Sequence, residues 1–544
     1  MNILNTVYFS NKNYWNLSVC LLLIIGFAFR IFHFIYNRSL WIDEVYLSTS
    51  LVKMDFRELA TKPLYYQQKA PIGFLWLNKL VINLFGNTEI FLRLIPLISG
   101  VASMLLFVPI SKYFLNNWGR LIAIGIISFS PALIYHSVEI KQYSTELFCT
   151  LLSLYMFIKY NQSTELKGMF QWGIIGATIL WFSHSAIFIL SGIAIGLGLQ
   201  YLLEKKWKSL FLSLIPFTIW LISFLINYTL FTHKHVESKW IVYWFRSYAN
   251  FMPFPPKSLT DLTWFPLNLY RMIDYPLGLL WNFNSLTNNP PLNQVLKMPF
   301  IGIGLLFIGV YALCRRNKAH FSILIPPIII TLIASSLELY PLTERFWVFL
   351  SPILILIIAF GFDYLIKGFK SKRTIVLLLI IVLFGPFYQS LIFTFKPETF
   401  YVHKKSFQRE ALIYLNNNYR KNDIVYIYWN DLPGYKLYKD IYHLNFNAVE
   451  GTDVRQQSKD LKDYYKNLEP DFNQLSGGKR IWLIYNTMYT SNIGDKIDDP
   501  SWYYQKNHNS TDDLVKELLR FGPTLKKYKT KDITVYLIDN NKKK

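Results

Sequence analysis

The amino-acid sequence predicts an α-helical membrane protein with about eleven transmembrane helices and a small α/β domain at its C-terminal end. Three observations lead to this fold class. Of the 544 residues, 52% are hydrophobic and only 17% are charged, whereas ordinary soluble domains carry about 25% charged residues. Apolar runs of about 20 residues, the length that crosses a bilayer, recur between residues 16 and 394. After residue 395 the apolar runs become short and alternate with polar stretches.

The apolar runs of the first part of the chain are interpreted as membrane spans. The first run, NLSVCLLLIIGFAFRIFHFIY, has no small-residue cleavage site, so we expect a retained helix there. The expected spans are 16–36, 91–114, 120–136, 143–160, 169–183, 185–203, 209–231, 297–314, 320–337, 346–366 and 374–394.

Positive charges are unevenly distributed among the links between these spans. The links EKKWKS (204–209), CRRNKAH (314–320) and KGFKSKR (367–373) are strongly basic. The alternate links, YHSVEIK, WFSHS and ELYPLTER, carry at most one lysine or arginine each. Because basic links remain in the cytoplasm, the alternate links are expected to face outward. The same alternation places outside the first loop (37–90, with interfacial helices), the 232–296 loop and residues 396–544.

The composition also bears on partners and location. The net charge of +22 is explained by the basic cytoplasmic links, so membrane lipids are expected as partners and nucleic acid is not. The many Lys, Asn and Ile residues favour a bacterial source and hence the inner (plasma) membrane. The three cysteines fall in apolar segments without metal-site spacing, which indicates neither a zinc site nor a disulfide framework.

The tail, residues 396–544, is expected to form the α/β domain. Its β-like runs are DIVYIYW, RIWLIY and DITVYLI, and its helix-like stretches are FQREALIYLNNNY and TDDLVKELLRFG. No glycine-rich phosphate fingerprint is present, so nucleotide binding is not predicted.

Two outward-facing stretches near the N-terminus hold candidate site residues. In SLWIDEVYLSTS (39–50), Asp43 and Glu44 follow the first span, where a carboxylate could act as general base towards a hydroxyl. The alternative is that the two acids are simply hydrated beside the helix. In QQKAPIGFLW (67–76), Lys69 could supply a point charge for a phosphate. Snorkelling towards lipid headgroups is the competing interpretation for this lysine.

Two later stretches add polar residues at outer helix ends. In SPALIYHSVEIKQYS (130–144), Glu139 and Tyr143 share a helix face, and Lys141 lies between them. In ELYPLTERFW (338–347), Tyr340 and Arg345 flank a short link, and arginine offers bidentate recognition of phosphate. Structural ion pairs, with Glu139 or with Glu338 and Glu344, are the competing interpretations.

The order of these motifs resembles the GT-C glycosyltransferases of the family 39 type, the group of the protein O-mannosyltransferases and aminoarabinose lipid A transferases. The similar strings are W-x-DE, KAPIGFLW followed by LFGNTEIFLRLIP, SP-x-x-x-Y-x-x-x-x-x-K-x-Y, and the late Y-P-x-x-x-R. The resemblance covers residues 37–160 well and 335–366 moderately. It does not cover the 232–296 loop or the tail.

The resemblance implies an inverting transfer of a sugar from a polyprenyl-phosphate donor to an acceptor hydroxyl on the outer face of the membrane. The acceptor class, whether lipid, glycan or protein, stays open. The acidic residue of the family's first outer loop matches Asp43, with Glu44 beside it. The phosphate-contacting lysine matches Lys69, and the arginine of the RLIP string matches Arg93.

Two departures from the family pattern affect the expected roles. Lys141 stands where the family often has arginine, which keeps the charge and loses the bidentate fork. Ala70 replaces the first proline of the usual KPP, and Pro71 keeps the second.

The chemistry of such a site follows from electrostatics. Cations from Lys69 and Arg345, with Arg93 as a third candidate, would stabilise the charge on the departing phosphate. Asp43 would take the proton of the attacking hydroxyl. No cofactor is required, because lysine and arginine supply the positive charge, and a divalent metal near Glu44 and Glu139 is left open.

Two other functions compete with this interpretation. A transporter or flippase would show paired repeats and charges at the bilayer midplane, whereas the charges here gather at the outer rim. A surface-glycan ligase or polymerase would share the lipid-linked donor, but its large loop lies between late spans.

Overall fold

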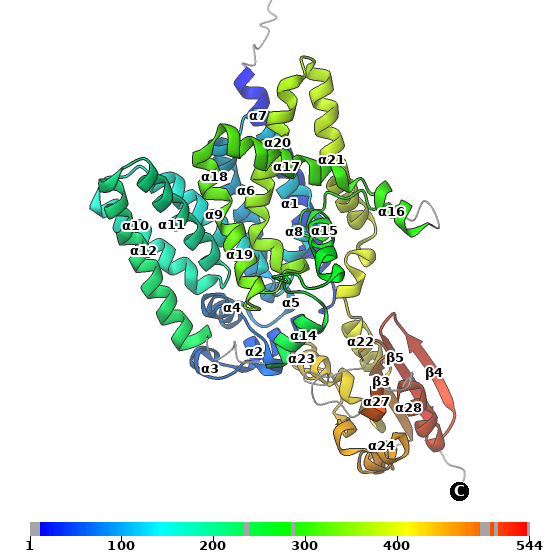
Figure 1. Cartoon of the computed structure of the whole chain (residues 1–544). Helices are drawn as coiled ribbons and strands as arrows, with labels where there is room; N and C mark the ends of the chain where they lie inside the picture. Colours follow the sequence, from blue (N-terminus) through cyan, green and yellow to red (C-terminus); the bar gives the residue numbers. More distant parts are fainter. Residues whose placement is uncertain are drawn as a thin grey trace, which may run out of the picture.

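Helices make up nearly all of the chain up to Phe395, and a five-stranded sheet follows in the C-terminal part (Figure 1). This computed structural model describes residues 11–232, 239–283, 289–477, 479–489, 501–504 and 510–540. The predicted fold class, a polytopic helical protein with a small C-terminal α/β domain, is confirmed.

Each of the eleven predicted spans coincides with helix. In chain order these helices are α1 (Asn11–Tyr36), α6 (Leu94–Phe114), α7 (Asn117–Phe129), α8 (Pro131–His136), α9 (Tyr143–Tyr160), α10 (Leu166–Phe182), α11 (Ala186–Leu203), α12 (Trp207–Asn227), α17 (Pro299–Arg316), α18 (Lys318–Leu324), α19 (Pro326–Ser336), α20 (Ser351–Leu365) and α21 (Lys372–Phe395). Within the described ranges, eight segments are long and apolar enough to cross a membrane by length and composition.

Three of the predicted spans are not single continuous α-helices, and prolines account for two of the interruptions. The span predicted at 120–136 divides into α7 and α8 at Pro131, whose ring nitrogen cannot donate a helical hydrogen bond. The span predicted at 320–337 likewise divides into α18 and α19 before Pro326. The span predicted at 346–366 begins with the tight 3-10 turns of η3 (Glu344–Leu350) and continues as α20.

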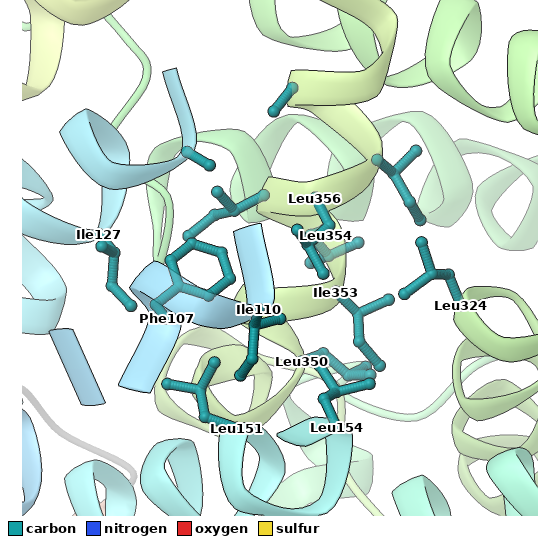
Figure 2. Packing of buried hydrophobic residues seen from close by; sticks show 14 of the residues in the cluster. Phe107, Ile110, Ile127, Leu151, Leu154, Leu324, Leu350, Ile353, Leu354 and Leu356 are labelled. Carbon is teal, nitrogen blue, oxygen red and sulfur yellow. The ribbon is translucent and has the colours of Figure 1, made fainter. Parts of the chain in front are cut away.

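α20 is the central helix of the bundle, and every residue from Ser351 to Ala359 is buried. Apolar side chains from α6, α7, α9 and α18 surround it (Figure 2). Glycines allow α17 to approach α20 closely, as small residues do between membrane helices. A Cβ atom added at Gly309 would lie 2.0 Å from the carbonyl oxygen of Ile357. The rigid position of α20 in turn fixes η3, which carries Arg345.

The predicted first outer loop folds into short helices. They are α2 (Ile42–Lys53), α3 (Phe56–Thr61), η1 (Tyr65–Gln67), α4 (Ile72–Phe85) and α5 (Glu89–Leu92). α2 is almost completely buried, whereas α4 exposes a row of large apolar side chains, namely Trp76, Leu77, Leu80, Leu84 and Phe85. α2 is therefore the framework of this region and α4 its apolar outer face.

The predicted 232–296 loop contains three further helices. They are α14 (Lys239–Ser247), α15 (Leu259–Asp274) and α16 (Pro290–Leu296). The Trp264 indole of α15 donates to the carbonyl oxygen of Ala249 at 2.9 Å, which ties the turn after α14 to α15. Residues 233–238 and 284–288 of this loop lie outside the described residues.

The C-terminal sheet has the strand order β2-β1-β3-β5-β4. Its strands are β1 (Asp423–Ile427), β2 (Ala448–Glu450), β3 (Arg480–Asn486), β4 (Thr524–Lys529) and β5 (Ile533–Asp539). β1 pairs in parallel with β2 and β3, β5 is antiparallel to β3, and β4 is antiparallel to β5. The three predicted strands correspond to β1, β3 and β5. The sequence pattern missed β2, which has only three residues, and β4, a lysine-rich edge strand.

Helices pack on both faces of the sheet, which gives the domain two cores. They are α22 (Gln408–Asn418), α23 (Leu432–Tyr442), α24 (Leu461–Asn467), α25 (Glu469–Asn473), α27 (Ser501–Tyr504) and α28 (Ser510–Leu518). α22 and α23 cover the face that carries Trp482 and Val535, and α24, α25 and α28 cover the face that carries Tyr426 and Leu483.

The C-terminal domain docks on the segment from α2 to α5 through one shared core. Leu47 and Leu75 of that segment belong to the same buried cluster as Tyr435 and Trp482 of the C-terminal domain. The buried carboxylate of Glu89 adds polar contacts across this junction. The basic link between α20 and α21 lies at the opposite end of the bundle from the sheet (Figure 1).

Candidate active site

Asp43 and Arg345 form an ion pair near the junction of the bundle and the C-terminal domain. The Arg345 guanidinium donates to Asp43 Oδ2 at 2.7 Å, although 302 residues separate the two in sequence. Their side chains retain 21% and 24% of their exposure, so the pair is accessible. Asp43 lies in the first turn of α2, and Arg345 extends from η3 at the N-terminal end of α20.

Aromatic rings frame this ion pair. The Arg345 guanidinium lies 5.7 Å from the ring centre of Trp41, 5.8 Å from that of Tyr143 and 5.7 Å from that of Phe346. Cations at such distances are attracted by the ring faces. The rings therefore hold the guanidinium beside Asp43 without using its remaining N–H donors.

The carboxyl group of Asp43 is kept ionised by its neighbours. Burial by itself would raise the pKa of Asp43, but the positive charges of Arg345 and Lys141, together with the Arg345 hydrogen bond, outweigh burial. The pKa of Asp43 consequently lies below its usual value. A carboxylate in this position is able to accept a proton at neutral pH.

Glu44 is adjacent in sequence but lies on a different side of α2. Its side chain has no exposed area, and its oxygens accept from Arg38 at 2.9 Å and from Arg93 at 3.3 Å. The backbone N–H of Ile140 also donates to Glu44, at 3.0 Å. Arg93 is buried as well and donates to the carbonyl oxygen of Arg38 at 2.7 Å. Glu44 and Arg93 thus hold α2 against the 137–142 turn behind the Asp43–Arg345 pair.

Lys141 connects the 137–142 turn with the segment that carries Lys69. The Lys141 ammonium donates to Gln68 Oε1 at 2.5 Å. Burial lowers the pKa of Lys141, and the negative charge of Asp43 opposes this effect. The backbone that presents Gln68 is unusual, because Tyr66 and Gln67 have φ values of 56° and 49°. Such left-handed conformations are uncommon for residues other than glycine and concentrate at functional sites.

Lys69 is a half-buried cation without an ion-pair partner. Within the described part of the chain, no residue forms a hydrogen bond or salt bridge with its ammonium. Burial lowers the pKa of Lys69 to about 8. A lysine in this state has positive charge available for an incoming anion.

Glu139 is enclosed by hydrogen-bond donors. Its Oε1 accepts from the Trp41 indole at 3.2 Å and from the Tyr135 hydroxyl at 3.4 Å, and its Oε2 lies 2.7 Å from His136 Nδ1. Burial would raise the pKa of Glu139, but the charge and hydrogen bond of His136, followed by the charge of Lys404, lower it to about 2. Glu139 is therefore a buried anion that orients Trp41 at the edge of the Asp43–Arg345 pair.

The two tyrosines predicted from the sequence have different environments. Tyr143 is 4% exposed, its ring faces Arg345, and its hydroxyl has no hydrogen-bond partner among the described residues. The Tyr340 hydroxyl donates to the carbonyl oxygen of Phe346 at 3.2 Å, and its ring packs against Phe188. Tyr340 thus stabilises η3 through its hydrogen bond to Phe346 and lies outside the site.

Three residues that sequence reasoning missed complete the arrangement. Arg38 bonds Glu44, and the Lys404 ammonium lies 2.7 Å from Glu344 Oε2 and 3.4 Å from the Tyr275 hydroxyl. Of these three residues, only Arg38 could have been recognised from the sequence, because it is a cation a few residues before the Asp43–Glu44 pair. Tyr275 and Lys404 lie in links where no local pattern indicates a role.

The donors present do not make a metal cluster. Throughout the described ranges, no group of three or more His, Cys, Asp or Glu side chains is arranged to hold a metal ion. The carboxylates of Glu44 and Glu139 are engaged by arginine, tryptophan and histidine donors. What the site offers an incoming molecule is the accessible carboxylate of Asp43 together with the cations Lys69, Lys141 and Arg345.

Comparison with known proteins gives one family match and several structural matches. The family model described as dolichyl-phosphate-mannose-protein mannosyltransferase matches residues 69–245. ArnT from Cupriavidus metallidurans bound to undecaprenyl phosphate aligns with a TM-score of 0.55 and 11% identity, over 97% of this chain and 98% of that chain.

A second solved structure belongs to an archaeal enzyme. The oligosaccharyltransferase from Archaeoglobus fulgidus, tethered with an acceptor peptide containing the NVT sequon, aligns with a TM-score of 0.51 and 13% identity. This alignment covers 92% of this chain and 72% of that chain. Comparison with curated protein sequences finds no match.

These findings establish the architecture. At 11% and 13% identity, the solved structures are similar to this chain in fold. The family match begins at Lys69 and includes the turn that carries Glu139 and Lys141. The chain is an integral membrane protein with the GT-C glycosyltransferase fold, and the resemblance inferred from its motifs is confirmed.

Proposed function

We propose that this GT-C chain is an inverting glycosyltransferase that moves a sugar from a polyprenyl-phosphate carrier to an acceptor hydroxyl. The observation that carries the proposal is the accessible carboxylate of Asp43 paired with Arg345, with the unpaired cation Lys69 in the adjoining segment. The ArnT structure that aligns over nearly the whole chain holds undecaprenyl phosphate, which supports a lipid-phosphate donor.

In the proposed reaction, the acceptor oxygen forms a bond to the anomeric carbon as the bond from that carbon to the phosphate oxygen breaks. Asp43 accepts the proton of the acceptor hydroxyl. The electron pair of the broken bond stays on the phosphate, where Lys69 and Arg345 stabilise the added charge. The products are the glycosylated acceptor and the polyprenyl phosphate, and a single displacement inverts the anomeric carbon.

The ion pair between Asp43 and Arg345 gives donor binding, the first step of this reaction, a way to activate the base. A donor phosphate competes with Asp43 for the Arg345 guanidinium, which favours phosphate oxygens in a bidentate geometry. As Arg345 turns towards the phosphate, Asp43 loses a stabilising charge and its pKa rises, which makes it a stronger base. Donor binding would thereby activate the base.

The other predicted site residues take supporting roles in this proposal. Glu44 and Arg93 hold α2 in place, and Glu139 orients Trp41 beside Arg345. Lys141 adds positive charge near Asp43.

The proposed setting is the outer face of a bacterial inner membrane. Helix α2, which carries Asp43, and the C-terminal domain lie at one end of the bundle, and the basic α20–α21 link lies at the other (Figure 1). The positive-inside rule therefore supports an extracytoplasmic site. The acceptor would reach Asp43 from the aqueous side, and the donor from the lipid side.

The test is transfer of label from polyprenyl-phosphate sugars in membranes that contain the full-length protein. Loss of a general base lowers such rates by about 10²–10⁴-fold, which is the decrease expected for Asp43→Asn. The matched control is Asp55→Asn, because Asp55 caps α3 in the same outer segment and asparagine caps equally well. Equal transfer by the wild type and Asp43→Asn would contradict the role of Asp43. Uptake of label without a new glycosidic bond would favour the transporter alternative.

A further inference from the structure

Lys404 is a buried lysine in the connection between the membrane bundle and the C-terminal domain. It ends η6 (Val402–Lys404), between α21 and α22, and is only 5% exposed. Lysine is rarely buried without specific partners, because its ammonium group loses its hydration. Its contacts therefore need an explanation that the transfer chemistry described above does not supply.

The side chain and the backbone of Lys404 contact opposite halves of the site. The ammonium lies 2.7 Å from Glu344 Oε2, and Glu344 directly precedes Arg345. The carbonyl oxygen of Lys404 accepts from Arg38 at 2.9 Å. The same guanidinium lies 2.9 Å from Glu44, which directly follows Asp43. Lys404 thus joins the neighbour of the proposed base to the neighbour of the phosphate-binding arginine.

The backbone conformation of Glu344 is unfavourable and therefore needs stabilising contacts. Glu344 has a φ of 33°, a left-handed conformation that is costly for a residue with a side chain. Its carboxylate is about half exposed, so packing alone does not fix it. The contact with Lys404 is the ion pair that anchors Glu344, and the direction of Arg345 depends on the backbone of Glu344.

A second row of hydrogen bonds links Lys404 to the rest of the site. Its ammonium donates to the Tyr275 hydroxyl at 3.4 Å and lies 4.6 Å from the ring centre of Tyr275. The Tyr275 hydroxyl lies 2.5 Å from His136 Nε2, and His136 Nδ1 lies 2.7 Å from Glu139. Glu139 in turn accepts from Trp41, which flanks Arg345. Both routes from Lys404 therefore end at Arg345.

We propose that Lys404 is a positioning residue that sets Arg345 for the donor phosphate. This inference rests on the proposed function and deepens it, because it makes the link to the C-terminal domain part of phosphate recognition. Lys404 does not touch the reacting atoms. It acts through Glu344, so its loss should weaken binding of the phosphate without affecting recognition of the lipid chain.

The experiment measures binding to the full-length protein in lipid nanodiscs, with undecaprenyl phosphate as the probe and undecaprenol as the phosphate-free control. Lys404→Met and Glu344→Gln should each weaken binding of the phosphate about tenfold, a typical size for indirect coupling. Neither variant should change binding of undecaprenol. Lys404→Arg keeps the charge and should bind nearly as the wild type does. The matched control is Lys405→Met, because the Lys405 ammonium instead lies over the Phe407 ring.

A double-mutant cycle separates positioning from a general structural role. In an Arg345→Ala background, Lys404→Met should cause no further loss of phosphate binding, because its effect acts through Arg345. An added loss in that background, or unchanged binding by both Lys404→Met and Glu344→Gln, would contradict the inference. Glu344→Gln keeps the test informative if Lys404→Met does not fold, since the Glu344 side chain is about half exposed. A wild type that binds undecaprenyl phosphate no better than undecaprenol would contradict the proposed function as well.

Discussion

At the scale of single residues, the site shows how differently two adjacent carboxylates can be used. Asp43 keeps 21% of its exposure and pairs with Arg345, whereas Glu44 is fully buried between Arg38 and Arg93. Successive residues on a helix point about 100° apart, so burying one side of α2 leaves the other side open. The Asp-Glu string therefore combines a candidate base with a structural anchor.

Lys69 makes the proposal sensitive to pH. Its pKa is lowered to about 8 by burial, and the ammonium is charged only below that value. The charge that holds the phosphate is present at pH 7 and is lost as the pH rises through about 8. We expect kcat/KM for a polyprenyl-phosphate sugar to fall with that midpoint, because the phosphodiester keeps one constant charge in this range. The measurement is a pH profile of kcat/KM from pH 6 to 10.

The matched variant for this profile is Lys69→Arg. Arginine stays protonated throughout the range, so its profile should lack the decline near pH 8 even if its absolute rate is lower. The same decline in both proteins would show that another group titrates and would remove Lys69 from the phosphate site.

At the scale of elements, the position of Arg345 depends on how α20 is packed. α20 is buried along its first nine residues, from Ser351 to Ala359, and begins directly after η3. Helices α17 and α20 approach each other closely at Gly309 of α17 and at Gly361 of α20. These contacts fix the height and the rotation of α20 in the bundle. The apolar packing of α17 and α20 is thus the physical basis for the position of Arg345 at the N-terminal end of α20.

A methyl group at Gly309 should disturb this packing. The Cβ of Gly309→Ala would lie 2.0 Å from the Ile357 carbonyl oxygen, so the helices must separate. Overpacking of this kind costs about 1–3 kcal/mol. The expected result is a lower melting temperature and reduced transfer. The matched control is Gly304→Ala in the same helix, where an added Cβ meets nothing within 4 Å. Equal melting temperatures for the two variants would contradict the close contact between α17 and α20.

At the scale of the whole molecule, the C-terminal domain is anchored to the bundle at Glu89. This carboxylate is 1% exposed, accepts from the Tyr438 and Tyr442 hydroxyls at 2.9 Å each, and pairs with Arg409. These three donors come from the C-terminal domain, and the acceptor comes from α5. Lys404 lies in the connection between the bundle and this docked domain. Docking of the domain and assembly of the site are therefore coupled.

Removing the Glu89 carboxylate should weaken the attachment of the C-terminal domain to the rest of the protein. Breaking a buried ion pair costs about 3–5 kcal/mol, because the remaining charge loses its partner. Glu89→Ala should therefore speed limited proteolysis of the 396–407 connection. The matched control is Glu469→Ala, which removes an exposed partner of Arg520 worth about 0–1 kcal/mol. Equal cleavage rates in the two variants would show that Glu89 does not hold the domain.

The sequence alone predicted the helical segments and the general class of the fold. Apolar content over about 20 residues is a local property, so each predicted span coincides with helix. Local chemistry also marked Asp43, Lys69 and Arg345 as candidates. It missed the short strand β2 and the edge strand β4, because short elements depend on their neighbours.

What the sequence by itself determined is therefore the membrane architecture and the set of charged residues near one set of helix ends. Only the tertiary structure decided that Asp43 meets Arg345, that Glu44 is buried behind it, and that Lys404 joins the two halves. The physical reason is that hydrophobicity acts along the chain, residue by residue. A contact between residues 302 positions apart instead depends on how all of the intervening helices pack.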